Sequence, residues 1–219
     1  MSSEKVRGVV TDITRLDITN DEVMDKYKVW AQSYDEDLSF IEYNPPKIGA
    51  SELSKLLGDN KNALILDAAA GTGLVAIELK KNGFQNIDAL DASAEMLEKA
   101  KEKKLYNNVI CDFMGPNRLD IKDDTYDGVV TVGSFCPGHV NGSCLAELIR
   151  IVKPGGYIVI ALKKVFLPVL GYNGQGLHEI MDEHTKAGRW DVLANHPIPR
   201  YHEMEEGMLY IFRIKVQGF

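Results

Sequence analysis

The segment LILDAAAGTG at residues 64–73 decides the fold of this chain. An apolar run of strand length stops at Asp67, small residues follow it, and a helical pattern begins at Leu74. Glycine tolerates positive φ and lets a ligand approach bare backbone, and the first N–H groups of a helix lack intrahelical partners. The segment therefore predicts a strand, a tight turn and a helix, with a nucleotide-type pocket at the turn.

The same turn fits two kinds of nucleotide ligand. Residues 71–76 read GTGLVA, which matches the dinucleotide pattern G-x-G-x-x-G/A, and Asp91 lies where that pattern expects a ribose-binding acid. Asp67, however, would face a pyrophosphate with like charge, and the turn contains no Lys or Arg. A ligand with ribose, adenine and a cationic end suits the turn better, and S-adenosylmethionine is such a ligand.

Composition indicates an ordinary globular protein. The chain has 219 residues, of which 45% are hydrophobic and 26% charged, and its 25 basic and 32 acidic residues give a net charge of −7. Without clustered Lys and Arg, nucleic acid is not expected as a partner. The N-terminus lacks the apolar core of a signal peptide and the apolar runs are too short to span a bilayer, so we expect a cytoplasmic (intracellular) protein that has no contact with membranes. The three cysteines lack metal-ligand spacing, and no metal site is predicted.

Predicted strands and helices alternate along most of the chain. The apolar patterns predict strands at 64–67, 86–91, 109–112, 124–132, 157–162, 190–194 and 208–216, and helices at 21–34, 45–57, 74–81, 93–104, 145–152 and 177–186. The last two strands are too close for a helical crossover, which predicts an antiparallel hairpin. We therefore expect an α/β fold with a Rossmann-like, doubly wound, seven-stranded sheet that is mostly parallel. Residues 1–40 are predicted as a partly ordered lead-in (1–19) and a lid helix, and residues 41–219 as a single domain.

Three successive predicted strands finish on an acid: Asp67, Asp91 and Asp112. A single acid at such a place is often only a helix cap, but ligands of open α/β sheets bind beyond the carboxyl ends of the strands. Asp91 can accept hydrogen bonds from both ribose hydroxyls, Asp112 from the adenine 6-amino group, and Asp67 can attract an ammonium group. Ala92 and Phe113 would flank the adenine.

From residue 27 to residue 162 the sequence resembles the class I methyltransferases. Their first motif, D-x-G/A-x-G-x-G, corresponds to residues 67–73; later marks are Asp127 and LxxIVKPGG at 148–156, and an N-terminal signature, YxxWAxxYD, lies at 27–35. The resemblance implies an S-adenosylmethionine-dependent methyltransferase that releases S-adenosylhomocysteine, with the helix at 21–34 closing over the methionine end of the cofactor. Ala69 departs from the glycine of many relatives. The residues expected to bind the cofactor are Tyr27, Trp30, Tyr34, Asp67, Ala69, Gly71, Thr72, Gly73, Asp91, Ala92, Met96, Cys111, Asp112, Phe113 and Gly133.

The methyl acceptor is expected over the loop at 133–139. Methyl transfer from a sulfonium depends more on alignment and exclusion of water than on a strong catalyst, so a base is not obligatory. His139 is the candidate general base, against the alternative of an ordinary surface histidine. Tyr34 and the segment at 196–202 are further candidates for the acceptor pocket. A small-molecule acceptor is favoured over a protein; the alternatives are a non-catalytic S-adenosylmethionine-binding regulator and an NAD(P)-dependent oxidoreductase.

Overall fold

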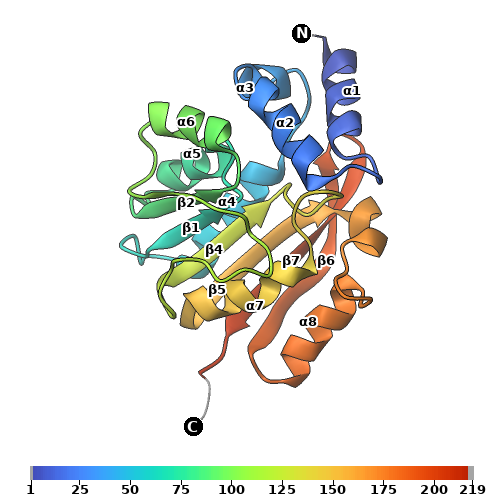
Figure 1. The fold of residues 1–219 in the computed structure, drawn as a ribbon. Helices are drawn as coiled ribbons and strands as arrows, with labels where there is room; N and C mark the ends of the chain where they lie inside the picture. Colours follow the sequence, from blue (N-terminus) through green and yellow to red (C-terminus); the bar gives the residue numbers. More distant parts are fainter. Residues whose placement is uncertain (1, 217–219) are drawn as a thin grey trace.

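The computed structural model describes residues 2–216, which build a seven-stranded sheet in the order β3-β2-β1-β4-β5-β7-β6 (Figure 1). Neighbours from β3 to β5 pair in parallel, and β7 pairs antiparallel with both β5 and β6. The predicted α/β fold with a C-terminal antiparallel hairpin is thereby confirmed. The strands are β1 Ile65–Ala68, β2 Ile87–Asp91, β3 Val109–Cys111, β4 Tyr126–Val132, β5 Val152–Lys163, β6 Trp190–His202 and β7 Glu205–Ile214.

Helices cover both faces of the sheet. Successive residues of a strand point to opposite faces, and in the central strands the residues on both faces are apolar. Ile65 and Val130 pack with α4 Pro45–Leu57 and α5 Leu74–Lys81, and α6 Ala94–Glu102 lies on the same face against Ala89. Leu66 and Val129 belong to the opposite core. That core is covered by α7 Leu145–Ile151, α8 Leu177–Lys186 and the 3₁₀ segments η1 Gly142–Cys144 and η2 Lys164–Val169.

Three N-terminal helices lie together at one end of the sheet, at the top of Figure 1: α1 Ser3–Ile13, α2 Asn20–Trp30 and α3 Tyr34–Leu38. The prediction of a partly ordered lead-in was wrong, because α1 has a Ser2 cap and buries Val6 and Ile13 in an apolar cluster of its own with α2 and α3. The predicted helix at 21–34 was also wrong at both ends. It begins at Asn20 and stops at Trp30.

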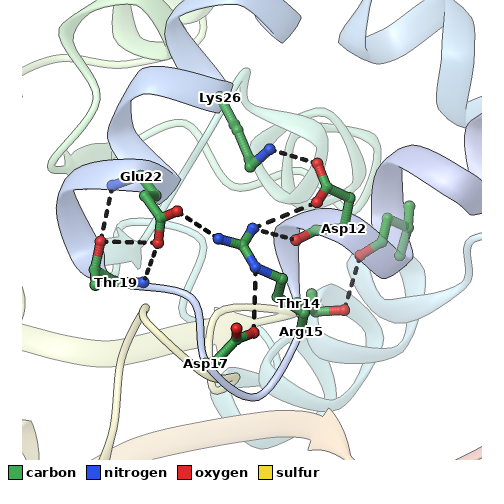
Figure 2. A network of polar contacts seen from close by, with 8 residues as sticks. Asp12, Thr14, Arg15, Asp17, Thr19, Glu22 and Lys26 are labelled. Carbon is green, nitrogen blue, oxygen red and sulfur yellow. Dashed lines mark hydrogen bonds and ion pairs between the residues drawn. The ribbon is translucent and has the colours of Figure 1, made fainter.

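A polar network joins the end of α1 to the start of α2 (Figure 2). The Arg15 guanidinium, in the connection between them, reaches Asp12, Asp17 and Glu22. Glu22 also closes a capping box with Thr19, so Thr19, not the predicted Asp21, caps α2. Exposed ion pairs are worth at most about 1 kcal/mol each, so the apolar cluster beneath them supplies most of the cohesion of these helices.

β6 is longer than the predicted strand at 190–194 because it absorbs the proline-containing connection. It lies at the edge of the sheet, where Pro197 and Pro199 cost few ladder hydrogen bonds. β5 likewise begins at Val152, before the predicted turn, and its register with β4 jumps across the glycines at 155–156. The division of the chain at residue 40 stays a prediction. Within residues 2–216, no helix has both the length and the hydropathy needed to cross a membrane.

Candidate active site

The turn after β1 has the backbone conformation that its small residues predict. Gly71 and Gly73 have φ values of 55° and 95°, and Gly73 begins α5 without a side-chain cap. Ala69 also has positive φ, at 58°, a conformation that costs a residue with a Cβ about 1–2 kcal/mol. The turn therefore has alanine in a conformation that favours glycine, and the backbone of Gly71 stays open, with no atom within 4 Å of where a Cβ would lie.

A first cavity of about 680 Å³ opens beside this turn, between the carboxyl ends of the strands and the N-terminal helices. Among the residues that line it, none is Lys or Arg. Such a surface fits a cationic ligand better than a pyrophosphate. The predicted site residues that the structure gathers around the first cavity are Tyr27, Tyr34, Ala69, Gly71, Asp91, Ala92, Met96, Asp112, Phe113, Gly133 and His139.

Asp91, at the end of β2, is held firmly at the cavity wall. One carboxylate oxygen accepts the Gly71 N–H at 2.8 Å, and the other accepts the Ser93 N–H, also at 2.8 Å. Burial raises the pKa of Asp91, and these backbone donors oppose the rise. Asp112, which directly follows β3, accepts the N–H of Phe113 at 2.7 Å. Both acids therefore lie where the sequence placed them, already oriented by backbone donors.

Asp67 does not lie at the strand end and does not line the first cavity. It is the third residue of β1, it is buried, and its carboxylate accepts a hydrogen bond of 2.6 Å from the Tyr106 hydroxyl. Burial raises the pKa of Asp67 to about 7, which the Tyr106 hydrogen bond opposes and the nearby charge of Asp91 reinforces. Asp67 therefore lies beneath the turn, where its carboxylate does not border the first cavity.

Four further predicted residues, Trp30, Thr72, Gly73 and Cys111, also lie outside the first cavity. The Trp30 indole donates to the buried Asp37 carboxylate at 2.9 Å. The Thr72 hydroxyl is hydrogen-bonded to the Asp35 carboxylate, and the Thr72 carbonyl accepts a hydrogen bond from Lys103. The sequence did not predict that Lys103 contacts this turn.

Gly73 faces Leu105: a Cβ at residue 73 would lie 2.9 Å from the Leu105 side chain. Cys111 is exposed. Thr72 and Gly73 therefore shape the turn, and Cys111 ends β3 on the outside.

His139 lies in the first cavity with both ring nitrogens engaged. Its Nδ1 is 2.8 Å from the Pro137 carbonyl, which can only accept, so the proton is on Nδ1. Nε2 then accepts a hydrogen bond from the Tyr27 hydroxyl at 3.1 Å. Burial lowers the pKa of His139 and keeps the ring neutral. The arrangement ties the 133–139 loop to α2.

A second cavity of about 580 Å³ adjoins the first, and Tyr27, Tyr34, Tyr43 and Gly133 line both. Gly133 is required at this partition, because a Cβ there would lie 2.2 Å from the Tyr43 hydroxyl oxygen. No periodic signal in the sequence pointed to Tyr43. The remaining lining residues of the second cavity are mostly apolar: Val10, Ile13, Thr14, Trp30, Leu38, Phe135, Cys136, Lys163, Phe166, Tyr201 and His202.

Only part of the predicted segment at 196–202 reaches the second cavity. Tyr201 and His202, at the end of β6, line it, whereas His196 is exposed. The Tyr201 hydroxyl donates to the Ala161 carbonyl at 2.9 Å, which fixes its ring. Tyr34, which was predicted for both the cofactor site and the acceptor pocket, lines both cavities.

Comparison with known proteins identifies the family. Residues 65–156 match the model of a methyltransferase domain. The chain is also 34% identical over 175 residues to methyltransferase-like protein 27 of Homo sapiens, a match that covers 80% of this chain and 70% of that protein. The chain belongs to the family of S-adenosylmethionine-dependent methyltransferases. S-adenosylmethionine is accordingly the cofactor of this methyltransferase, and the NAD(P)-dependent alternative is wrong.

One further relative and one solved structure are similar to this chain. The methyltransferase is 31% identical over 149 residues to the ubiquinone/menaquinone biosynthesis C-methyltransferase UbiE of Bdellovibrio bacteriovorus, covering 64% of this chain and 62% of that protein. Its fold matches that of a TehB-like, S-adenosylmethionine-dependent methyltransferase from Corynebacterium glutamicum, with a TM-score of 0.59, 18% identity, and coverage of 86% of this chain and 98% of the other.

Proposed function

We propose that this methyltransferase transfers the methyl group of S-adenosylmethionine to a small molecule held in the second cavity. The observation that carries the proposal is that two cavities meet at Tyr27, Tyr34, Tyr43 and Gly133, which line both. A sulfonium bound in the first cavity and an acceptor bound in the second would then approach each other at the place where these shared residues lie. The mostly apolar lining of the second cavity favours a small molecule over a charged protein segment.

Relatives support an apolar acceptor. The similarities include UbiE of Bdellovibrio bacteriovorus and a demethylmenaquinone methyltransferase of Corynebacterium glutamicum, whose names place them in quinone biosynthesis. The regulator alternative predicts that side chains fill the acceptor pocket, whereas a second cavity does adjoin the first.

Roles for the first-cavity residues follow from where they lie. Asp91 would hold the ribose hydroxyls, Asp112 the adenine amino group, and Ala92 and Phe113 the faces of the adenine. Asp67 would act from beneath the turn, as a carboxylate that attracts the cationic end without touching it. When bound, the cofactor supplies an electrophilic methyl group on a positively charged sulfur, which becomes neutral on transfer; the protein's task is to orient the groups and exclude water.

A calorimetric titration tests the cofactor roles. The purified protein is titrated with S-adenosylmethionine, S-adenosylhomocysteine and NADH, and so are two variants, Asp91→Ala and Asp120→Ala. Asp120 is exposed and lies outside both cavities, so it serves as the matched control. Hydrogen bonds to a charged group are worth about 1.5–3 kcal/mol each, so Asp91→Ala should weaken both adenosyl ligands more than tenfold.

Each alternative outcome has a clear meaning. Binding of NADH alone would sink the proposal. Unchanged affinity in Asp91→Ala would remove Asp91 from the cofactor site while leaving the rest of the proposal in place.

A further inference from the structure

His202 carries a polar atom with no partner in the structure. Its ring is only 6% exposed, and Nε2 is the one buried side-chain nitrogen or oxygen, within residues 2–216, that makes no hydrogen bond. Leaving such an atom unpaired typically costs about 1–3 kcal/mol, so native proteins rarely keep one without a use. His202 lines the second cavity.

The other ring nitrogen fixes which form of the imidazole is present. His202 Nδ1 is 2.8 Å from Oε2 of Glu205, and Lys163 Nζ donates to the same oxygen at 2.6 Å. Burial alone would raise the pKa of Glu205, but the hydrogen bonds from Lys163 and His202 outweigh it and hold that pKa below its ordinary value. A carboxylate can only accept, so Nδ1 carries a proton, and in the neutral ring the lone pair of Nε2 is free.

The surroundings of His202 define what can pair with that lone pair. Tyr43 packs edge-on against the His202 ring, with the centroids 6.0 Å apart, and Tyr43 also borders the first cavity. Phe135 and Phe166 are among the apolar residues that line the same cavity. An aromatic ligand fits such walls, and one that carries a hydrogen-bond donor would satisfy Nε2.

His139, the histidine first considered as a base, differs in this respect. Its Nε2 is already bonded to the Tyr27 hydroxyl and its Nδ1 to the Pro137 carbonyl. We call Tyr27, Tyr34 and Tyr43, which line both cavities, the tyrosine partition. His139 lines the first cavity and His202 the second. Both ring nitrogens of His139 are hydrogen-bonded, whereas Nε2 of His202 is not.

We propose that His202, oriented by Glu205, is the general base of this enzyme, and that the acceptor is a phenol-like molecule whose hydroxyl donates to Nε2 in the second cavity. The inference rests on the function proposed above. In the transfer, Nε2 takes the proton of the hydroxyl, and the electron pair left on oxygen forms the new bond to the methyl carbon. The electron pair of the broken sulfur–methyl bond stays on sulfur. The products are a methyl ether, S-adenosylhomocysteine and an imidazolium that faces the Glu205 carboxylate.

Two probes that differ by one hydroxyl test the proposal without turnover. The full-length protein is first saturated with S-adenosylhomocysteine, which has no methyl group to give, and is then titrated with 4-nitrophenol and with nitrobenzene. Affinity is followed by calorimetry, and ionisation of the bound phenol by its absorbance. The same titrations are made with His202→Gln, Glu205→Gln and His139→Gln, and with His196→Gln as a control on the exposed part of the same strand.

The wild-type protein should bind 4-nitrophenol about tenfold more tightly than nitrobenzene and should shift the bound phenol toward phenolate. His202→Gln should lose the phenolate band and most of the preference, while His196→Gln keeps both. His139→Gln alters the first cavity and the Tyr27 contact, but any probe that this variant binds should still show the phenolate band. Glu205→Gln can donate to Nδ1 and so allow the other tautomer. It should lose the phenolate band while still binding the probe, which separates a positioning role from a merely structural one.

The outcomes separate this inference from the proposed function. S-adenosylhomocysteine binding in the His202, Glu205 and His196 variants serves as the folding control, since these three residues lie outside the first cavity. Failure of the wild-type protein to bind S-adenosylhomocysteine would refute the proposed function. If it binds, equal affinity for the two probes, no binding of either, or a preference that survives His202→Gln overturns the assignment of His202 and of the acceptor class.

Discussion

Replacing Asp67 by asparagine should stabilise the ligand-free protein at pH 8 and weaken its binding of S-adenosylmethionine. Burial raises the pKa of Asp67 from its ordinary value of 3.8 to about 7. A gap of about three pKa units, at about 1.4 kcal/mol each, means that ionised Asp67 destabilises the fold by about 4 kcal/mol above pH 7. Asparagine still accepts from Tyr106, but its amide N–H groups need new partners, so we expect a net gain of about 2–4 kcal/mol.

The sign of the pH dependence follows from the direction of the shift. Because the pKa of this acid is higher in the folded than in the unfolded state, its destabilising effect is absent below about pH 3.8, grows as the pH rises, and is complete above about pH 7. The advantage of Asp67→Asn should therefore shrink by about 3 kcal/mol between pH 8 and pH 5. For a chain of this size, the gain at pH 8 corresponds to a rise in Tm on the order of 10 °C.

Thermal unfolding at pH 8 and pH 5, without ligand and with S-adenosylmethionine, measures both effects. Asp88→Asn is the matched control. Asp88 is also buried, but three donors stabilise its carboxylate: the Tyr126 hydroxyl bonds one oxygen, and the backbone and side-chain N–H groups of Asn108 bond the other. Removing the charge at residue 88 should therefore not raise Tm. The reasoning is refuted if Asp67→Asn melts below the wild-type protein at pH 8, or if the difference between them is the same at both pH values.

Two further predictions follow from other contacts. Trp30→Phe leaves the buried Asp37 carboxylate with only the Ser33 hydroxyl as a donor, so the free energy of unfolding, measured by urea denaturation, should fall by about 1–3 kcal/mol. The affinity of this variant for S-adenosylhomocysteine should change less than about threefold, because Trp30 does not line the first cavity. A larger loss of affinity would place Trp30 in the cofactor site. Burial raises the pKa of Cys136 to about 12 and also raises that of Cys144, whereas Cys111 is exposed, so iodoacetamide at pH 8 should modify Cys111 first; mass spectrometry that found all three cysteines modified at equal rates would contradict this.

The parts of the fold that could be predicted from the sequence are those set by local pattern. The strand, turn and helix around Gly71 and Gly73 follow from an apolar run beside residues that tolerate positive φ, and α5 and α8 have the predicted bounds. The α1 helix was missed although Val6, Val9, Val10 and Ile13 have the i, i+3, i+4, i+7 spacing of one helical face and all four join its apolar cluster. Three of these residues are valine, and Gly8 lies between them, so the intrinsic helix propensity of the segment is low.

The parts of the site that were missed depend on contacts between distant residues. Asp67 reads as a strand-end acid, but its environment is set by Tyr106, 39 residues away, and that contact leaves no trace in spacing. His139 and His202 look equivalent as loop histidines. Which of them has a free nitrogen is decided by Tyr27, 112 positions from His139, and by Glu205, just across the β6–β7 turn from His202.

The tyrosine partition makes the two binding events thermodynamically linked. Tyr27, Tyr34 and Tyr43 border both cavities, so a ligand that restrains these rings from one side also changes the surface met by a ligand on the other side. Linkage is reciprocal: the factor by which one ligand alters the affinity of the second equals the factor by which the second alters that of the first. If the acceptor binds in the second cavity as proposed, the same rings would contact both products after transfer, and they would then influence the order in which the products leave.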